Sequence, residues 1–460
     1  MTRGRGPQDR ALGRIAAPRA VREITRRLEE AGYETWAVGG AVRDAALGLA
    51  VGDWDLATRA RPEEVRRLFR RTVPIGIEHG TVGVFGRDGV LYEVTTFRRD
   101  VETYGRHARV EFADTIEEDL ARRDFTCNAL AWHPLTGEVR DPFLGLEDLR
   151  SGRLRTVGNA ADRFAEDYLR VLRALRFAGH FVLEIERSTW GALVAAVPEL
   201  TRLSAERIRE ELWKILGKTA RASRALSLYA ASGALGVLYP ELEALIGLEP
   251  DGGGGPDVWS KSLLAVDALP PTRPRLRFAA LVHAIGMPGS RMRDLRGGWR
   301  FVGHETLGAR KARQLLARLR ASNADTERVT RLVQHQSSLF PPDAPPAGIR
   351  RWLRDVGPDL VRDLFRLRFA LWRAEPGTGT ETPRDLLERW AAAHRVLLER
   401  PVLDVAGLAI GGKELRALGL PPGPEYGRIL RELVEVVIER PELNTRSDLM
   451  EWVEREELGR

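Results

Sequence analysis

Two short stretches near the N-terminus decide the fold of the first domain: GGAVRD at residues 39–44 and DWD at residues 53–55. The glycine pair stands where a short apolar segment meets a helical pattern, so the spacing predicts a strand, a turn and a helix. Backbone N–H groups at such a turn can approach a phosphate closely, and the helix N-terminus adds partial positive charge. The pattern predicts phosphate binding at Gly39 and Gly40, with Arg43 able to reach a triphosphate.

The two aspartates of the second stretch are candidate metal ligands. Asp53 and Asp55 are two residues apart on an expected strand, so both side chains should leave the same face. Paired carboxylates suit Mg²⁺, which also takes phosphate oxygens and water, and this is the chemistry of nucleotidyl transfer. Glu93 lies on a later expected strand. It either supplies a third carboxylate to this site or is an ordinary charged residue on the surface of the strand. Sugar-nucleotide glycosyltransferases also use Asp-x-Asp, so the pair alone leaves the reaction open.

The order of secondary structure predicts an α+β protein with several domains. The chain has 460 residues, 43% hydrophobic composition and a net charge of +7, which permits a polyanionic partner. The single cysteine, Cys127, excludes a disulfide scaffold, and no apolar run is long enough for a membrane span, so we expect a cytoplasmic protein without a membrane partner. Strand and helix signals alternate up to about residue 155, and helices follow. The expected helices are Val21–Ala31, Ala41–Leu49, Glu63–Arg70, Ala161–Gly179, Ser188–Val197 and Ser204–Leu216, and the expected strands are Thr35–Val38, Trp54–Ala57, Thr81–Phe85 and Val90–Phe97.

Four further segments carry a family resemblance. They read EEDLARRDFTCNAL (117–130), DPFLGLEDL (141–149), EDYLRVLRALRF (166–177) and LSAERIREELWKIL (203–216). Together with the glycine turn and Asp-x-Asp, this ordered set resembles the bacterial class II tRNA nucleotidyltransferase and poly(A) polymerase family. That family belongs to the polymerase-β-like nucleotidyltransferase superfamily. The resemblance is highly specific over residues 37 to 216 and looser beyond.

The resemblance implies a polymerase-β-like head with a mixed sheet, followed by an extended all-α neck, body and tail. We expect the boundaries to be a disordered tail at 1–19, the nucleotidyltransferase head at 20–155, a neck for base selection and RNA binding at 156–218, a helical body at 219–375, and a tRNA-binding tail at 376–460.

The resemblance also implies addition of C and A, from CTP and ATP, to the 3′ end of tRNA. PIGIEHGTVGV (74–84) resembles the tRNA enzymes, whereas poly(A) polymerases carry a basic element there, and residues 408–433 with Asn444-Thr445 look like a tRNA-binding tail. A poly(A) polymerase and a non-catalytic tRNA-binding protein are the alternatives. Intact Asp53 and Asp55 argue against the second of these.

By the same resemblance, Asp53 and Asp55 are Mg²⁺ ligands and Arg123 and Asn128 contact the nucleotide. Arg122 is expected to face elsewhere, as the helical neighbour of Arg123.

The resemblance makes Asp167 and Arg170 the template for base selection. Cytosine and adenine each present an amino donor beside a ring-nitrogen acceptor, so a carboxylate and a guanidinium complement them. Guanine and uracil present the reverse pattern and would leave polar groups unpaired. Arg173 and Arg176 follow at three-residue spacing on the expected helix, and we expect them to contact base or phosphates.

Residues 98–112 resemble the flexible loop that bears on the switch from C to A. Gly105-Arg106-His107 departs from the family pattern there, and the loop is about two residues short. A partial enzyme that adds only CC or only A therefore stays open.

The body resembles an HD-type phosphohydrolase domain that has lost its metal site. Lys261 stands where the first ligand His should be, and Ala284 replaces the Asp that should follow His283. Neither replacement can bind a metal. We therefore expect His283, His304 and His335 to be structural and the body to support tRNA.

Overall fold

The computed structural model describes residues 16–76, 80–104, 107–249, 255–293, 298–375 and 382–459. These residues form two compact units, one up to Pro240 and the other from Glu241. Three expectations fall wholly or mainly outside the described residues: the tail at 1–19, the Gly105-Arg106 part of the expected loop, and the start of the last segment at residue 376.

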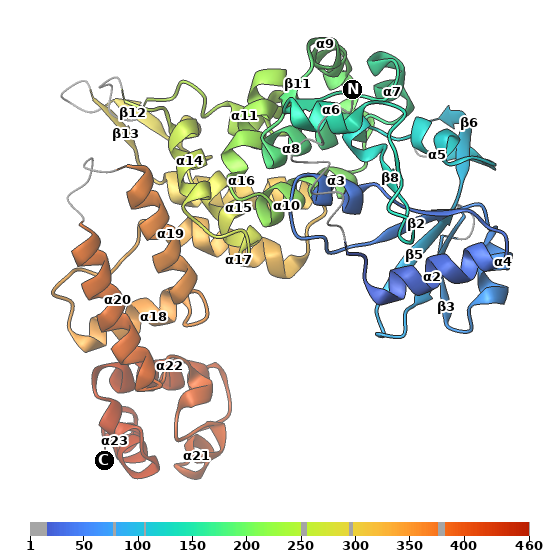
Figure 1. The fold of residues 1–460 in the computed structure, drawn as a ribbon. Helices are drawn as coiled ribbons and strands as arrows, with labels where there is room; N and C mark the ends of the chain where they lie inside the picture. The colour runs from blue at the N-terminus through green and yellow to red at the C-terminus, as the bar shows by residue number, and fades with distance from the viewer. Residues whose placement is uncertain are drawn as a thin grey trace. The chain divides into compact units, whose positions relative to one another are not determined.

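The first unit contains a mixed seven-stranded sheet in the order β3-β4-β5-β2-β1-β8-β9. Figure 1 labels β2, β3, β5 and β8 among these strands. β2 and β5 run parallel, and every other neighbouring pair is antiparallel. All four residues of the interior strand β1 are buried. The expected mixed sheet is therefore confirmed. The strands are β1 (Thr35–Val38), β2 (Asp55–Thr58), β3 (Thr72–Gly76), β4 (Thr81–Phe85), β5 (Leu91–Thr96), β8 (Ala131–Trp132) and β9 (Val139–Arg140).

Four helices accompany the sheet: α2 (Arg19–Glu30), α3 (Gly40–Ala46), α4 (Pro62–Leu68) and α5 (Ile116–Ala121). The long helix α2 is strongly amphipathic, with Val21, Ile24 and Leu28 buried, and it contacts β1 and α4. The short helix α4 begins at a proline, and its N-terminus is capped by the Glu64 carboxylate, which accepts from the Arg61 N–H. α3 begins directly at the end of β1, where the glycine turn was predicted.

The segment expected as a flexible loop has regular backbone on both sides of the undescribed pair. β6 (Arg98–Tyr104) and β7 (His107–Phe112) pair antiparallel, with an irregular register between Asp100 and Glu102. The interpretation of the described part as a loop is thus wrong, because the two halves pair with each other as a separate ribbon.

Helices dominate the rest of the first unit. The single helix expected over Ala161–Gly179 is interrupted, because α7 ends at Glu166 and α8 begins at Leu169. α8 packs closely on α11 at Gly179, where an added Cβ would lie 2.5 Å from the Ala225 backbone nitrogen. The main helices are α6 (Gly145–Arg150), α7 (Ala160–Glu166), α8 (Leu169–Phe181), α9 (Arg187–Ala196), α10 (Ala205–Lys218) and α11 (Ala222–Ser232).

Where the structure describes the second unit, its regular elements are helices apart from one antiparallel strand pair, β12 (Arg291–Arg293) with β13 (Trp299–Phe301). Near the C-terminus, Leu415, Leu433 and Leu449 join α21, α22 and α23 in a core of their own. Among the helices that the structure describes, none is long and apolar enough to cross a membrane. The main helices are α14 (Val258–Asp267), α15 (Pro274–Val282), α16 (His304–Arg318), α17 (Asn323–His335), α18 (Pro346–Val356), α19 (Val361–Ala374), α20 (Pro383–Leu398), α21 (Gly412–Ala417), α22 (Pro424–Glu439) and α23 (Arg446–Glu457).

Candidate active site

A cavity of about 660 Å³ in the first unit collects most of the predicted site residues. Its walls come from the end of β1, the start of β2, strands β4 and β5, the segment after α5, and the start of α8. Asp53 and Arg176 are described by the structure and are not among its lining residues. The predicted residues that line it are Gly39, Gly40, Arg43, Asp55, Glu93, Arg123, Asn128, Asp167, Arg170 and Arg173.

The carboxylates of the cavity come from two parallel strands. Asp55 is the first residue of β2 and is in register with Glu93 on β5. Burial raises the pKa of Asp55 to about 6, the negative charges of Glu93 and Asp53 add to the rise, and Arg123 opposes it. Asp53 lies before the first residue of β2, but the alternation continues through it: Asp53 and Asp55 are exposed, whereas Trp54 and Leu56 are buried. Together with the effect of Asp53 on the pKa of Asp55, this pattern agrees with the expectation that both aspartates leave one face. Strand pairing adds Glu93 beside Asp55.

This donor set fits a hard divalent cation. The pKa of Asp55 is raised first by burial and then by the negative charges of Glu93 and Asp53, and a bound cation would favour the ionised carboxylate against both effects. Mg²⁺ is commonly held by one or two carboxylates together with substrate phosphates, so two carboxylates on adjacent strands suffice as the protein's share. Within the described ranges, no group of three or more His, Cys, Asp or Glu side chains is placed to hold a metal ion by itself.

The glycine turn has the conformation that its sequence predicts. Gly39 has φ 68°, and a Cβ there would lie 2.8 Å from Arg123 Nη1. A side chain would therefore both strain the backbone and displace that guanidinium. The turn brings Gly40, as the first residue of α3, to the wall of the cavity.

Arg43 follows this turn on α3, and most of its guanidinium N–H groups donate to other side chains of the protein. Its guanidinium donates to Asp44 Oδ1 at 2.7 and 2.9 Å and to Asn128 Oδ1 at 2.6 Å. It also stacks over the rings of Phe177 and Phe181 on α8. The residue is 8% exposed, so it fixes α3 to α8 while its edge reaches the cavity.

Asn128 extends this contact into a network. Its Nδ2 donates to Asp124 Oδ1 at 2.9 Å, and Asp124 Oδ2 accepts from Arg173 at 2.7 Å. Burial alone would raise the pKa of Asp124, but the charge of Arg173 and the hydrogen bonds lower it to about 2. A chain of polar contacts thus runs from Arg43 through Asn128 and Asp124 to Arg173, joining the head to α8.

The two adjacent arginines after α5 share one carboxylate. Asp119 is fully buried and accepts from Arg122 Nε and Arg123 Nη2, each at 3.0 Å. Both arginines line the cavity, so the expectation that Arg122 faces elsewhere is wrong. The cause is local: α5 ends at Ala121, and helical spacing no longer separates the two side chains.

Asp167 occupies the break between α7 and α8. Its backbone is extended, Oδ1 accepts from the Leu169 N–H at 3.0 Å, and Oδ2 accepts from Arg207 Nη2 at 2.7 Å. Arg170, in the first turn of α8, donates to the Arg163 and Arg122 carbonyls and to Glu166. The interpretation that Asp167 shares a continuous helix face with Arg170 is wrong, but the break still places both on the cavity wall.

Arg176 takes another direction. Its Nε donates to Glu211 Oε2 at 2.6 Å on α10, and Glu211 also accepts from Lys214. Glu211 is fully buried, so this pair joins two helices beside the cavity. The predicted contact of Arg176 with the base or phosphates has no support in this geometry.

Two site residues were missed from the sequence: Asp124 and Arg207. Both lie inside motifs that the sequence singles out, at 117–130 and 203–216, so the motif was the available signal. The motifs do not show which distant residue each one contacts, because Asp124 pairs with Arg173 and Arg207 pairs with Asp167 only in the folded chain.

The pocket of the expected HD-type site in the second unit is a cavity of about 250 Å³. Lys261 is buried, and its Nζ lies 3.1 Å from Glu375 Oε1. His283 and His304 line the same space, and each donates through Nδ1–H to a backbone carbonyl, that of Ala280 and of Phe301 respectively. Burial lowers the pKa of His283 to about 4. His335 is not among the lining residues that the structure describes. The predicted structural role of the histidines stays a prediction.

Comparison with known proteins gives matches over nearly the whole chain. The profile of the poly A polymerase head domain matches residues 35–155, and that of a probable RNA and SrmB-binding site of polymerase A matches residues 183–246. The chain is 34% identical to a CCA-adding enzyme of Anoxybacillus flavithermus over 92% of this chain and 94% of that protein. For a CCA-adding enzyme of Geobacillus stearothermophilus the identity is 33% over 94% and 95%.

Two further comparisons differ in how much of the chain they cover. A CCA-adding enzyme of Leuconostoc mesenteroides is 48% identical, but this match spans only 45% of this chain and about half, 51%, of that relative. The crystal structure of the Bacillus stearothermophilus CCA-adding enzyme in complex with CTP aligns over 99% of this chain and 98% of that chain, with TM-score 0.72 and 29% identity.

The fold and the cavity therefore define a polymerase-β-like nucleotidyltransferase head joined to a helical RNA-binding part. More particularly, the near-full-length relatives show that the chain belongs to the bacterial class II family of CCA-adding enzymes and poly(A) polymerases. Nucleotidyltransferases of this family generally use a divalent metal ion.

Proposed function

We propose that the protein is a tRNA nucleotidyltransferase that adds C and A, from CTP and ATP, to the tRNA 3′ end without a nucleic-acid template. One observation carries the proposal: a single cavity joins the paired carboxylates Asp55 and Glu93 to the base-reading candidates Asp167 and Arg170. The relatives named CCA-adding enzymes support the same activity. We further propose that the enzyme acts in the cytoplasm.

The carboxylate end of the cavity is the reacting end in this proposal. Asp55 and Glu93, with Asp53 beside them, would hold Mg²⁺, which when bound supplies positive charge to the reacting phosphate and the 3′-oxygen. The Gly39 N–H donates to the Leu130 carbonyl at 3.2 Å, so the Gly40 N–H and the guanidinium of Arg123 would bind the triphosphate and neutralise its remaining charge.

The helix break is the base-reading end. A carboxylate has about four acceptor positions, and Asp167 uses two of them for Arg207 and Leu169, so acceptor capacity remains for the amino group of C or A. A guanidinium has five N–H groups, and three acceptors engage Arg170, so donors remain for the ring nitrogen. Arg207 and Arg122 would hold these two side chains in place. The helical regions 219–375 and 376–460 would support the tRNA.

The test uses tRNA that ends before CCA, after C, or after CC, incubated with CTP, ATP or both, with products sized on a gel. We expect stepwise growth to CCA and no further extension. Asp55→Ala should abolish every step while tRNA binding survives. Asp162→Ala, which removes an exposed carboxylate on α7, is the matched control and should retain addition. Growth that stops at CC or requires CC would show a partial enzyme, and long poly(A) on unstructured RNA would contradict the proposal.

A further inference from the structure

A second cavity of the first unit, about 680 Å³ in volume, shares no lining residue with the catalytic cavity. It lies among α2, the end of α4, the start of β3 and the turn after β4. Strand β4 connects the two sites, because Thr81 at its start lines the catalytic cavity and Phe85 at its end lines this one. Four steps of about 3.3 Å separate Thr81 from Phe85, so their Cα atoms lie roughly 13 Å apart along the strand. We call this second cavity the arginine hollow.

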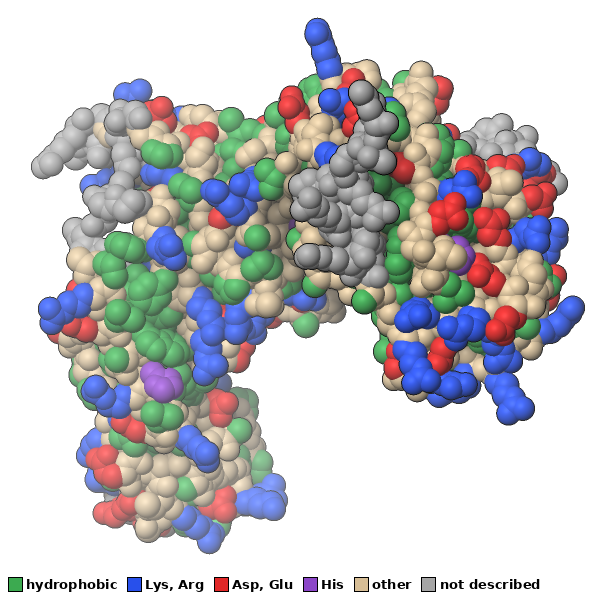
Figure 2. All heavy atoms as spheres, viewed as in Figure 1, with side chains coloured by type: hydrophobic (Ala, Val, Ile, Leu, Met, Phe, Trp, Pro, Cys, Tyr) green, Lys and Arg blue, Asp and Glu red, His purple; other side chains and the backbone are tan. Residues whose placement is uncertain are grey.

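The arginine hollow carries a marked excess of positive charge. Five arginines line it against two glutamates, Glu23 and Glu30, and all five are exposed. Figure 2 shows Lys and Arg side chains gathered over this part of the head, where Figure 1 places α2 and α4. Glu23 is already shared between Arg19 at 2.8 Å and the solvent-exposed Arg87 at 3.5 Å, which leaves little negative charge to offset the rest. The arginines are Arg26, Arg27, Arg70, Arg71 and Arg87.

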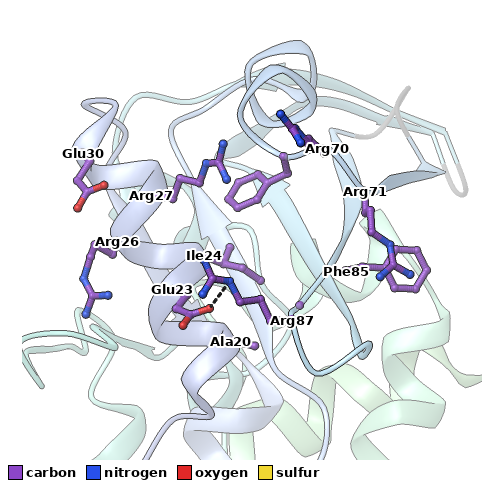
Figure 3. Close-up of a pocket in the computed structure, with 12 residues that line it drawn as sticks. Ala20, Glu23, Ile24, Arg26, Arg27, Glu30, Arg70, Arg71, Phe85 and Arg87 are labelled. Carbon is purple, nitrogen blue, oxygen red and sulfur yellow. Dashed lines mark ion pairs between the residues drawn. The ribbon is translucent and has the colours of Figure 1, made fainter.

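Two of these arginines lie over aromatic rings. The guanidinium of Arg27 is 5.2 Å from the ring centre of Phe69, and that of Arg71 is 5.0 Å from the ring centre of Phe85. In Figure 3 Arg71 lies against Phe85, and Arg26 and Glu30 extend from the side of α2 turned away from it. A guanidinium stacked on a ring keeps its N–H edge for a phosphate and offers a flat face on which a base can stack.

We propose that the arginine hollow is a second RNA-contact site on the head, which binds the phosphates and bases of a single-stranded segment. Basic side chains that track a backbone, interleaved with aromatic rings, are the features that bind single strands without reading their sequence. An acidic peptide would use the charge but not the stacked rings, and one free phosphate would use a small part of the 680 Å³. The inference rests on the proposed function for the choice of RNA as the polyanion.

The test measures equilibrium binding of a fluorescent oligo(U) of roughly 15 nucleotides, a length within the site size of single-strand binders, to the full chain. No nucleotide is added, so a failure here is distinct from a failure of CCA addition. Arg27→Gln with Arg71→Gln removes two charges from the hollow. Arg66→Gln with Arg67→Gln removes two exposed charges from α4 outside it and is the matched control. Salt is varied from about 50 to 200 mM.

Each lost phosphate contact should lower the slope of log K against log salt by about 0.7, so the hollow variant should lose roughly 1.4 and bind about 25-fold more weakly near 0.1 M salt. The control should change little. Equal effects of both variants, or no effect of either, would overturn the proposal. Arg70→Gln with Arg87→Gln is a second hollow variant and should weaken binding in the same direction, which guards against misfolding of the first pair.

Two competitors identify the ligand. Unlabelled oligo(U) should displace the probe from the wild type at far lower concentration than poly-glutamate of similar charge or than ATP. If poly-glutamate binds the wild type as tightly and loses this binding in the hollow variant, the site takes an acidic protein segment instead. If ATP or inorganic phosphate competes as well as the RNA, the site is a simple anion site. Either result would overturn the RNA assignment.

Discussion

Replacing Asp167 tests whether this side chain selects the base. Asp167→Ala removes the acceptor for the amino group of C or A and also the repulsion of the carbonyl of U or G. Asp167→Asn keeps the shape but adds an amide donor that matches that carbonyl. We expect both variants to lower the preference for CTP over UTP and for ATP over GTP, with the larger change for Asn.

The magnitude follows from the contacts of the carboxylate. Two of its acceptor positions are taken by Arg207 and Leu169, so the remaining positions accept about one hydrogen bond from the amino group of the base. Loss of one complementary contact costs about 1–3 kcal/mol, which corresponds to a fall of roughly one to two decades in each ratio. Arg207→Ala should act in the same direction but less strongly, because it removes the anchor and leaves the acceptor.

The assay is the ratio of kcat/KM for the correct and incorrect nucleotide, measured on tRNA that awaits C or A. Ratios are needed because loss of a negative charge near the triphosphate changes all rates together. Asp162→Asn makes the same charge change on exposed α7 and should leave the ratios unchanged. If the Asp167 variants slow all four nucleotides equally and the ratios hold, Asp167 does not select the base and the reasoning fails.

Three further predictions concern the frame around the site. Arg176→Ala should lower the midpoint of thermal unfolding, because Glu211 is left buried with only Lys214 and breaking such a pair costs about 3 kcal/mol or more. The double variant Arg176→Leu with Glu211→Leu should lower the midpoint less, and an equal fall in both variants would contradict the pairing. The ionised Asp124 carboxylate contributes about 2 kcal/mol to the free energy of unfolding. This contribution is complete above the ordinary pKa of 3.8 and should be lost as the pH falls through about 2, so Asp124→Asn should weaken the fall of the unfolding free energy at acid pH. An unchanged dependence on acid pH would contradict the lowered pKa. His283→Ala should retain nucleotide addition, and metal-dependent phosphatase activity that disappears in this variant would contradict a lost HD-type site.

Local patterns predict several elements of the first unit well. β1 and β4 have the expected bounds, and α2, α9 and α10 begin and end within two residues of expectation. These segments bury a regular apolar face, which is the signal that a sequence carries locally. The strands β8 and β9, at one side of the sheet, have two residues each and were missed, because a pattern of period two needs more than two residues to be visible.

The helix break shows what the sequence alone could not predict. The segment EDYLRVLRALRF contains neither glycine nor proline, so periodicity indicates one continuous helix. In the structure the Asp167 backbone is extended because its carboxylate accepts from the Leu169 N–H and from Arg207, which is 40 residues away in sequence. A contact of that range leaves no local trace. The family motif marked the position as functional, whereas its conformation depends on the fold.

The contacts also divide the predicted site residues into two kinds. Asp55 and Asp167 keep acceptor capacity at the cavity, whereas Arg43, Asn128 and Arg173 use much of theirs on one another and on Asp124. A motif cannot distinguish the two kinds, because residues of both kinds lie within the same motifs and serve the same activity. The second kind holds α3 and α8 at a set distance, and with them the phosphate turn and the base-reading break. Because catalysis requires both ends of one nucleotide to be placed together, loosening this network should reduce rate for all four nucleotides and leave the base ratios largely intact. The two kinds of residue are therefore separable by the same ratio measurement that tests Asp167.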